Sequence, residues 1–207
     1  MALLASPDVG IHRVALLKNC SLASFGSFTM AKKLSGSCAC GSVRYQLLDK
    51  PMFVHCCHCD DCQRLTGSAF VLNAIIETQA VKLLRGTPVA VPVPRENGPH
   101  DIYRCPTCQT AIWSDYGNKP NIRFVRVGTL DKPGALKPDV HIYTRWKVKW
   151  LTLPKRTPSF RDYYNTGKLW PKASLKRLNA ALGRKGASSS PKTMAKTIRR
   201  RRRLSAA

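Results

Sequence analysis

The cysteines are the residues of this sequence that are best placed to do chemistry. Seven of the nine fall into three short clusters, in which the thiols lie one or two residues apart. Cysteines at this spacing can turn their sulfurs toward one point from a single tight turn, as a tetrahedral Zn²⁺ ion requires. The clusters are Cys38 and Cys40, then Cys57, Cys59 and Cys62, then Cys105 and Cys108, and the remaining cysteines are Cys20 and Cys56.

The clusters differ in how many ligands they offer. The first and third together provide four thiols from two distant segments, which predicts a closed site whose metal joins those segments. The middle cluster provides three, and three protein ligands with a vacant fourth position are typical of a catalytic zinc that binds substrate. We therefore expect two Zn²⁺ ions per chain. The structural ion would be bound by Cys38, Cys40, Cys105 and Cys108, and the catalytic ion by Cys57, Cys59 and Cys62.

Other uses of these thiols stay open on the sequence alone. Disulfides are disfavoured, because cysteines one residue apart bridge only with strain. Both zincs could be structural, with His55, Cys56 or His58 as a fourth ligand of the middle cluster. An iron–sulfur cluster fits poorly, because the middle cluster lacks a fourth thiolate. Since His58 lies between two ligands, we expect its side chain to point away from the metal, and we interpret His141 as a packed core histidine.

Short runs of β-favouring residues must position these clusters. Their ranges are 42–48, 69–76, 81–84, 102–104, 111–114, 122–127 and 140–143, and His55 and Cys56 are expected to end a further strand. The Pro- and Gly-rich segment 86–100 is predicted to be a loop or an edge strand. Two helices are expected, at 60–65 and 174–182, each followed by glycine. Many short strands with few helices predict a mainly all-β, mostly antiparallel fold.

The two ends of the chain differ from the body at residues 30–171. Residues 1–29 are apolar and Ser-rich, and they form an N-terminal extension that is either a targeting segment or disordered. Residues 172–207 are expected to form a helix followed by a basic, disordered tail. No run of 18 apolar residues occurs, so we expect no membrane-spanning helix. Reduced thiol clusters favour an intracellular location, in the cytoplasm first and in the mitochondrion or nucleus next.

The basic tail supports a second class of function. Residues 172–207 carry 12 basic side chains and no acidic one, out of a formal net charge of +24. Residues 199–203 are consecutive arginines, and such runs bind polyanions by releasing their counterions. On this hypothesis the chain is a non-enzymatic, zinc-stabilised binding protein whose tail contacts nucleic acid or an acidic protein surface.

The order and spacing of the clusters resemble those of the glutathione-dependent formaldehyde-activating family, also called the CENP-V/GFA domain. The resemblance covers about residues 34–155 and includes the segments around each cluster together with 127–131 and 140–143. It implies a β-tent fold of several antiparallel sheets around zinc sites, and the same division of the cysteines into a structural and a catalytic set. One departure is Gln109, where family members usually have glycine, and it suggests an altered turn after the last cysteine pair.

The resemblance further implies a zinc-dependent carbon–sulfur lyase that joins formaldehyde and glutathione into S-hydroxymethylglutathione. Such a protein would act on a glutathione–aldehyde adduct, although the residues do not specify the aldehyde. Because glutathione is net anionic, a basic side chain near the open metal should attract it. Arg64 follows the middle cluster directly and is the first candidate for binding this thiol substrate, with Arg44 and Arg145 as weaker candidates.

Overall fold

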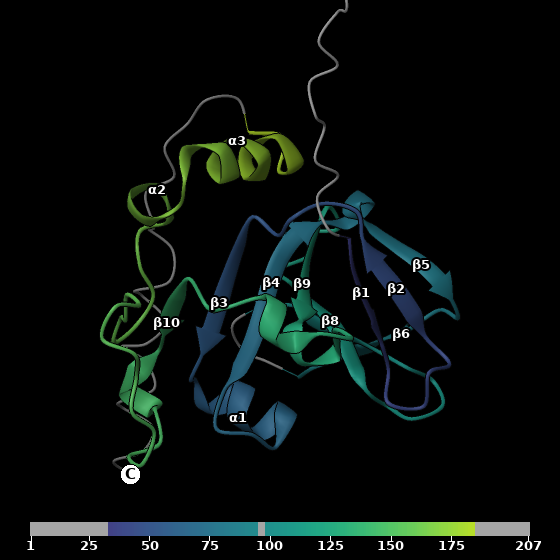
Figure 1. Cartoon of the computed structure of the whole chain (residues 1–207), viewed down its shortest axis with the longest axis horizontal. Coiled ribbons are helices and arrows are strands. Elements are labelled where there is room, and N and C mark those ends of the chain that lie inside the picture. Colours follow the sequence, from purple (N-terminus) through teal and green to yellow (C-terminus); the bar gives the residue numbers. More distant parts are fainter. Residues whose placement is uncertain (1–32, 95–97, 185–207) are drawn as a thin grey trace, which may run out of the picture. The chain divides into compact units, whose positions relative to one another are not determined.

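The computed structural model describes residues 33–94 and 98–184, which contain two β-sheets (Figure 1). A three-stranded sheet has the order β1 (Leu34–Ser37), β2 (Arg44–Leu47), β5 (Val81–Arg85). A seven-stranded sheet has the order β10 (Val140–Ile142), β3 (Phe53–Cys57), β4 (Val71–Glu77), β9 (Ile122–Arg126), β8 (Ala111–Tyr116), β7 (His100–Arg104), β6 (Val89–Pro92). The α-helices are α1 (Asp60–Thr66), α2 (Thr166–Leu169) and α3 (Lys172–Ala181). Short 3₁₀ helices span Thr78–Ala80, Val127–Thr129, Pro133–Ala135 and Thr144–Trp146.

The predicted mainly all-β class is confirmed. Each run predicted as a strand overlaps one, and β6 lies within 86–100 at the edge of the large sheet, as expected for a Pro-rich strand. All strand pairs are antiparallel except β10 with β3, which is parallel. None of the helices in this part of the chain is long and apolar enough to cross a membrane. Residues 1–29 and the arginines at 199–203 lie outside the described residues, so the expectations for them stay predictions.

The strand β1 was not predicted, because its sequence lacks β-branched and aromatic residues. It forms because its backbone pairs with β2 and because Gly36 allows a close approach to the neighbouring segment. A Cβ atom at Gly36 would lie 2.5 Å from the backbone oxygen of Thr129 and 2.6 Å from the ring of Tyr45. The glycine therefore serves packing between the small sheet and the end of β9.

The two faces of the large sheet contribute to separate cores. Side chains that pair across strands share a face, because strand residues alternate between faces. Val54, Ala74, Val125 and Trp113 are successive cross-strand partners, and they pack in one core with Tyr45 of the small sheet. This core holds the two sheets together.

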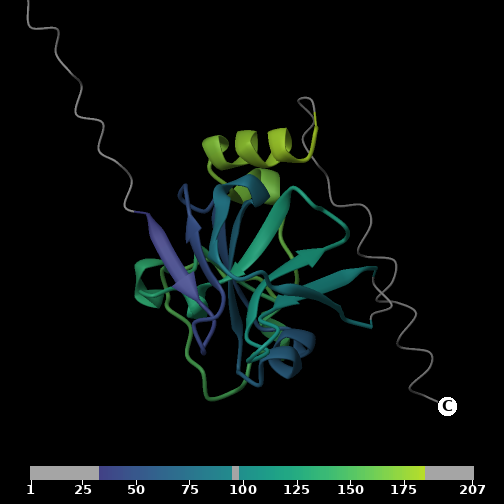
Figure 2. The same ribbon diagram turned by 90° about the vertical axis from the view of Figure 1, so that its right-hand side faces the viewer.

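The opposite face carries the middle cysteine cluster. Cys57 pairs with Val71 across β3 and β4, and both side chains belong to the second core together with Trp170. Leu175 and Leu178, one turn apart on α3, pack against this core. In both views, α2 and α3 lie at one end of the large sheet and α1 lies at the other (Figures 1 and 2).

Ionic and polar contacts hold α3 in place. The Arg177 guanidinium binds both carboxylate oxygens of Glu77, at 2.8 and 2.6 Å, and Glu77 is 9% exposed at the end of β4. The Asn121 amide donates to the carbonyl oxygen of Ala181 at 3.0 Å. A bidentate, largely buried arginine–carboxylate pair has a defined geometry, so it fixes the direction of the helix.

A buried aromatic chain connects α2 to β3. Trp170 Nε1 donates to Tyr164 Oη at 2.6 Å, and Tyr164 Oη lies 2.6 Å from His55 Nε2. The Tyr164 hydroxyl accepts the indole hydrogen of Trp170, and its own proton is available to donate to His55 Nε2 when that nitrogen is unprotonated. Burial lowers the pKa of His55 to about 3, which keeps this ring neutral at neutral pH.

We expect the free energy of unfolding to fall as the pH drops below about 6.5, where His55 of the unfolded chain binds a proton that the folded chain excludes. The loss should continue at about 1.4 kcal/mol per pH unit toward the folded pKa of about 3. Denaturant unfolding at about pH 7.5 and 5.5 measures it, with His55→Gln as the control because glutamine keeps an acceptor for Tyr164 and does not titrate. The wild type should lose about 1.4 kcal/mol more than this variant. Equal losses would contradict the assignment to His55.

Candidate metal centres

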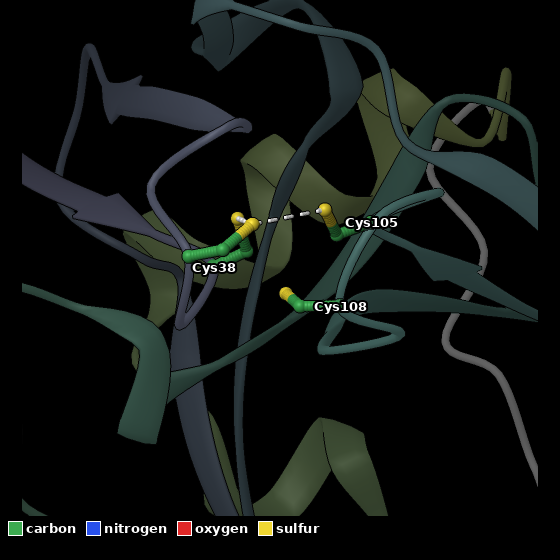
Figure 3. A group of neighbouring side chains, drawn as sticks. Cys38, Cys105 and Cys108 are labelled. Atoms are coloured by element: carbon green, nitrogen blue, oxygen red, sulfur yellow. Dashed lines mark hydrogen bonds between the residues drawn. The ribbon is translucent and has the colours of Figure 1, made fainter.

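The first and third cysteine clusters come together between two loops. Cys38 and Cys40 lie in the turn between β1 and β2, and Cys105 and Cys108 lie in the turn between β7 and β8. Their four sulfur atoms all lie within 4.8 Å of one another. Cys40 Sγ is 3.5 Å from Cys38 Sγ and 3.8 Å from Cys105 Sγ. Figure 3 shows the side chains of Cys38, Cys105 and Cys108 directed into the space between the two loops.

Backbone hydrogen bonds shape both turns. The amide of Cys38 donates to the Val43 carbonyl at 3.0 Å, and the amide of Val43 donates back to Cys38 Sγ at 3.2 Å. In the second turn the amides of Cys105 and Gln109 donate to Thr110 O and Cys105 O, both at 3.0 Å. Gln109 has φ 60°, so the left-handed conformation that glycine would favour is kept with a side chain in place. The expected alteration of this turn is therefore not seen in its φ.

Nearby hydroxyl groups lower the pKa of two of the four thiols. The Thr110 hydroxyl, 3.1 Å from Cys108 Sγ, lowers the pKa of Cys108 to about 5. Hydrogen bonds from Ser42 lower the pKa of Cys40 below its ordinary value. Burial raises the pKa of Cys38, which favours the protonated thiol, and a bound cation would favour its thiolate. Cysteines bind zinc as thiolates. Two thiols with a lowered pKa and one with a raised pKa are together suited to a site whose remaining protons are displaced by a bound cation.

The middle cluster is built at the junction of β3 and α1. Cys57 is the last residue of β3, Cys59 is the N-cap of α1, and Cys62 lies in the first turn of that helix. Cys57 Sγ lies 3.4 Å from Cys59 Sγ, which also accepts the amide hydrogen of Cys62 at 3.4 Å. The Gly67 cap, with φ 62°, ends the helix in the left-handed conformation. Capping the helix with a thiol places all three sulfurs within 4.8 Å of one another.

Both clusters fit Zn²⁺. With zinc–sulfur bonds of about 2.3 Å, a tetrahedral site has sulfurs about 3.8 Å apart. The measured separations of 3.4, 3.5 and 3.8 Å lie close to this value. Among the described residues, the first site gathers four thiols and the second gathers three with no fourth histidine, cysteine or carboxylate ligand. The clusters are thus consistent with one enclosed and one open zinc site.

The open cluster is an unfavourable place for free thiolates. Hydrogen bonds from Cys59 and Cys62, together with burial, raise the pKa of Cys57 far above its usual range. The pKa of Cys62 is also raised, to about 12, because the lowering by its hydrogen bond with Cys57 and by the charge of Arg126 is outweighed by its hydrogen bond with Cys59 and by its burial. A cation is needed to bring all three thiols into the anionic form, which is the form that binds zinc.

A third group lies on the other face of β3. Cys56 Sγ is 3.5 Å from His58 Nε2, which is 3.0 Å from His141 Nδ1, and all three side chains are buried. The predicted orientation of His58 away from the middle cluster agrees with this grouping, and His141 is a buried residue as interpreted. Neither His55 nor Cys56 joins the three-thiol cluster. His58 directly follows β3 and His141 lies in β10, so the histidine pair connects β10 to the segment just after β3.

The candidate arginines have different surroundings. Arg64 lies exposed on α1, two residues after Cys62. Arg44 forms an ion pair with Asp131 at 3.0 Å, and Arg145 forms one with Asp162 at 3.0 Å while its guanidinium stacks 3.8 Å from the Trp146 ring. Both of the weaker candidates are therefore already paired with carboxylates.

Sequence reasoning missed Arg126, which is 5% exposed on the cysteine-bearing face of the large sheet. The signal was the alternation over 122–127, which places Arg126 on the same side as Ile122 and Phe124. An arginine that lies on the same side of a strand as two apolar residues is expected to be buried. Burying a charged guanidinium group costs free energy, so such a residue indicates a structural or functional role.

Comparison with known proteins identifies the family. Residues 33–146, more than half of the chain, match the family model described as glutathione-dependent formaldehyde-activating enzyme (GFA). The chain belongs to this family, and its cysteine clusters are consistent with zinc binding. A crystal structure of a Rhodobacter sphaeroides protein is similar at 20% identity and a TM-score of 0.38, covering 50% of this chain and 91% of that chain. A comparison with curated proteins gave no match.

Proposed function

We propose that this chain is a zinc-dependent carbon–sulfur lyase acting on a glutathione–aldehyde adduct, in the manner of S-hydroxymethylglutathione synthesis. The observation that carries the proposal is the unequal grouping of thiols, four in one cluster and three in the other. The family is named for glutathione and formaldehyde. Glutathione carries a thiol, so it could supply a fourth sulfur ligand to the open cluster. The catalytic ion would be held by Cys57, Cys59 and Cys62, and the structural ion by Cys38, Cys40, Cys105 and Cys108.

The reaction needs no oxidant or reductant. The glutathione sulfur forms a bond to the carbonyl carbon of the aldehyde, and the thiol proton ends on the former carbonyl oxygen; the reverse reaction breaks the same bond. Zinc, when bound, favours the thiolate form of a substrate thiol at neutral pH. Three cysteine ligands already give the site a net negative charge, so it suits a sulfur nucleophile better than a strongly polarised water.

The chain's own residues would hold the substrate and limit access of water. Gln63 Nε2 donates to the carbonyl oxygens of His58 and Trp146, at 2.8 and 2.9 Å, which ties the cysteine loop to the turn after β10. Tyr143, in that turn, packs against the core that contains Cys57 and has φ 57°, a strained value for a bulky residue. Arg64 is proposed to attract the anionic thiol from solution.

Cobalt substitution tests whether a thiol reaches the open cluster, because cobalt reports its sulfur ligands in the visible spectrum. We expect glutathione to change the charge-transfer absorption of the cobalt protein with saturation at one equivalent per open site. S-methylglutathione, which lacks the thiol but keeps both carboxylates, is the matched control and should have no such effect. A spectrum that is unchanged by glutathione, or changed equally by the methylated peptide, would refute the proposal.

A further inference from the structure

A pocket lies at the end of the large sheet, between α1, which follows the middle cluster, and the turn between β7 and β8. Its volume is about 440 Å³, which is within the range of small-molecule sites. Leu65 and Thr66 of α1 and Val71 of β4 form one side of it, and Arg104 and Arg126 contribute its charged groups. No acidic side chain is among the described residues that line it.

Arg126 is the unusual member of this lining. Its Nη1 donates to Asn73 Oδ1 at 2.5 Å and its Nη2 to Ser114 Oγ at 2.7 Å, and both partners are neutral. Its Nε is buried without a hydrogen-bond acceptor in the part of the chain that the structure describes. No described carboxylate lies within ion-pair distance of this guanidinium. A buried cation without an anion is costly, so a negative group from elsewhere would stabilise it.

Arg104 adds a second positive charge to the same pocket. It is half-buried at the end of β7, and Nη1 donates to the Gln109 carbonyl oxygen at 2.9 Å. This bond fixes the guanidinium while leaving donors for a ligand, since arginine carries five N–H groups. Two guanidinium groups in a pocket lined otherwise by mainly apolar side chains form a site for an anion with an apolar stem.

Strand register places the pocket within reach of the thiol site. Cys57 pairs with Val71, and Arg126 pairs with Asn73 two residues further along the same face of β4. The strands β3 and β9, which carry Cys57 and Arg126, are separated by two strand spacings, or about 10 Å. At its near edge, Thr66 Oγ1 donates to the Cys62 carbonyl at 2.7 Å. In glutathione the central residue carries the sulfur, and the eight bonds from it to the γ-glutamyl carboxylate span about 9 Å when extended, so the sulfur can lie at the cysteines while this carboxylate reaches the arginines.

We propose that this pocket binds a carboxylate of the thiol substrate through Arg104 and Arg126, so that the open metal site selects anionic peptide thiols over neutral ones. The inference rests on the proposed function, because it takes the three-thiol cluster as the place where the substrate sulfur binds. Arg104 and Arg126 would recognise the carboxylate by direct contact, and Arg64 would attract the anionic thiol from a distance.

The test compares glutathione with its esters in the cobalt-substituted full chain. The monoethyl ester blocks the glycyl carboxylate and the diethyl ester blocks both, so the series shows which carboxylate is recognised. We expect the wild type to bind glutathione roughly 10- to 100-fold more tightly than the diethyl ester, the size of a charge-assisted contact. Arg104→Ala and Arg126→Gln should each reduce this ratio toward one, mainly by weakening the binding of glutathione. Lys176→Ala, which removes an exposed charge on α3, is the matched control and should leave the ratio unchanged.

The outcomes separate this inference from the function on which it rests. If no thiol of the series changes the cobalt spectrum, the proposed lyase function fails. The carboxylate site is refuted if all three thiols bind equally to the wild type. It is also refuted if the ratio of the affinities for glutathione and the diethyl ester is unchanged in both arginine variants. In either case thiol binding at the open cluster is still supported. A fall of the ratio in Lys176→Ala as large as in Arg104→Ala would also refute it, since general charge would then explain the preference. The comparison of glutathione with its esters in the wild type shows by itself whether a carboxylate is recognised, so this part of the test does not depend on the folding of Arg126→Gln.

Discussion

Replacing Cys105 by serine is expected to release one metal ion per chain and to leave the domain unfolded or insoluble. Cys105 is fully buried at 0% exposure, and its sulfur joins a cluster with Cys40, which is 65 positions away in the sequence. Structural zinc sites contribute about 10–16 kcal/mol in small zinc domains, comparable with the whole stability of an ordinary domain. An ion bound there would fasten the β1–β2 turn to the β7–β8 turn, in addition to the bond from the Ala39 amide to the Thr110 hydroxyl at 3.2 Å.

Zinc content per chain and the free energy of unfolding measure this effect. Cys56→Ser is the matched control, because Cys56 is also buried, at 2% exposure, and belongs to neither zinc cluster. We expect the control to keep both metals and to lose no more than about 2 kcal/mol. If Cys105→Ser retained both metals and unfolded at the same denaturant concentration as Cys56→Ser, the four-thiol cluster would not be a structural metal site.

Local sequence patterns were sufficient to predict most strands and the grouping of the cysteines into two clusters. Strand β9 shows an apolar alternation, and the C-x-C and C-x₂-C spacings restrict how their thiols can be used. The helix α1 was predicted to stop at Gly67, and it is capped there as expected. Asp60 and Asp61 were expected to cap its start, but the N-cap is Cys59 and both aspartates lie in the first turn. These features depend on residues close together in the chain, so a single sequence contains them.

Features that depend on long-range register could not be predicted in this way. The group of Cys56, His58 and His141 exists because β10 lies parallel to β3, with His141 directly beside Cys56. No local pattern indicates that a strand more than 80 residues later will pair at this position. The pocket has the same origin, since Arg104 and Arg126 come from β7 and β9, which lie on either side of β8 in the folded sheet.

Cys62→Ser should show the opposite behaviour to Cys105→Ser: a folded chain that keeps its four-thiol ion, loses the second metal and no longer binds glutathione. All three thiols of the open cluster come from one short segment, 57–62, which is held without metal by the β3–β4 register and by the Gln63 bond to the His58 carbonyl. Removing one ligand therefore breaks no long-range connection, and we expect a loss in unfolding free energy below about 2 kcal/mol. The metal affinity of the open site should fall at least about 100-fold, because one of only three protein ligands is gone.

The measurements are metal content, unfolding free energy and the acceleration of exchange between formaldehyde and glutathione, followed by nuclear magnetic resonance. Cys56→Ser again serves as control, because it changes a buried thiol next to the cluster without removing a proposed ligand. The acceleration should persist in the control and disappear in Cys62→Ser. Equal collapse of Cys62→Ser and Cys105→Ser would make both clusters structural, and the open coordination position on which substrate binding depends would not exist. Opposite outcomes would instead show that the chain uses the same ligand chemistry twice, once to join distant segments and once to leave room for a substrate sulfur.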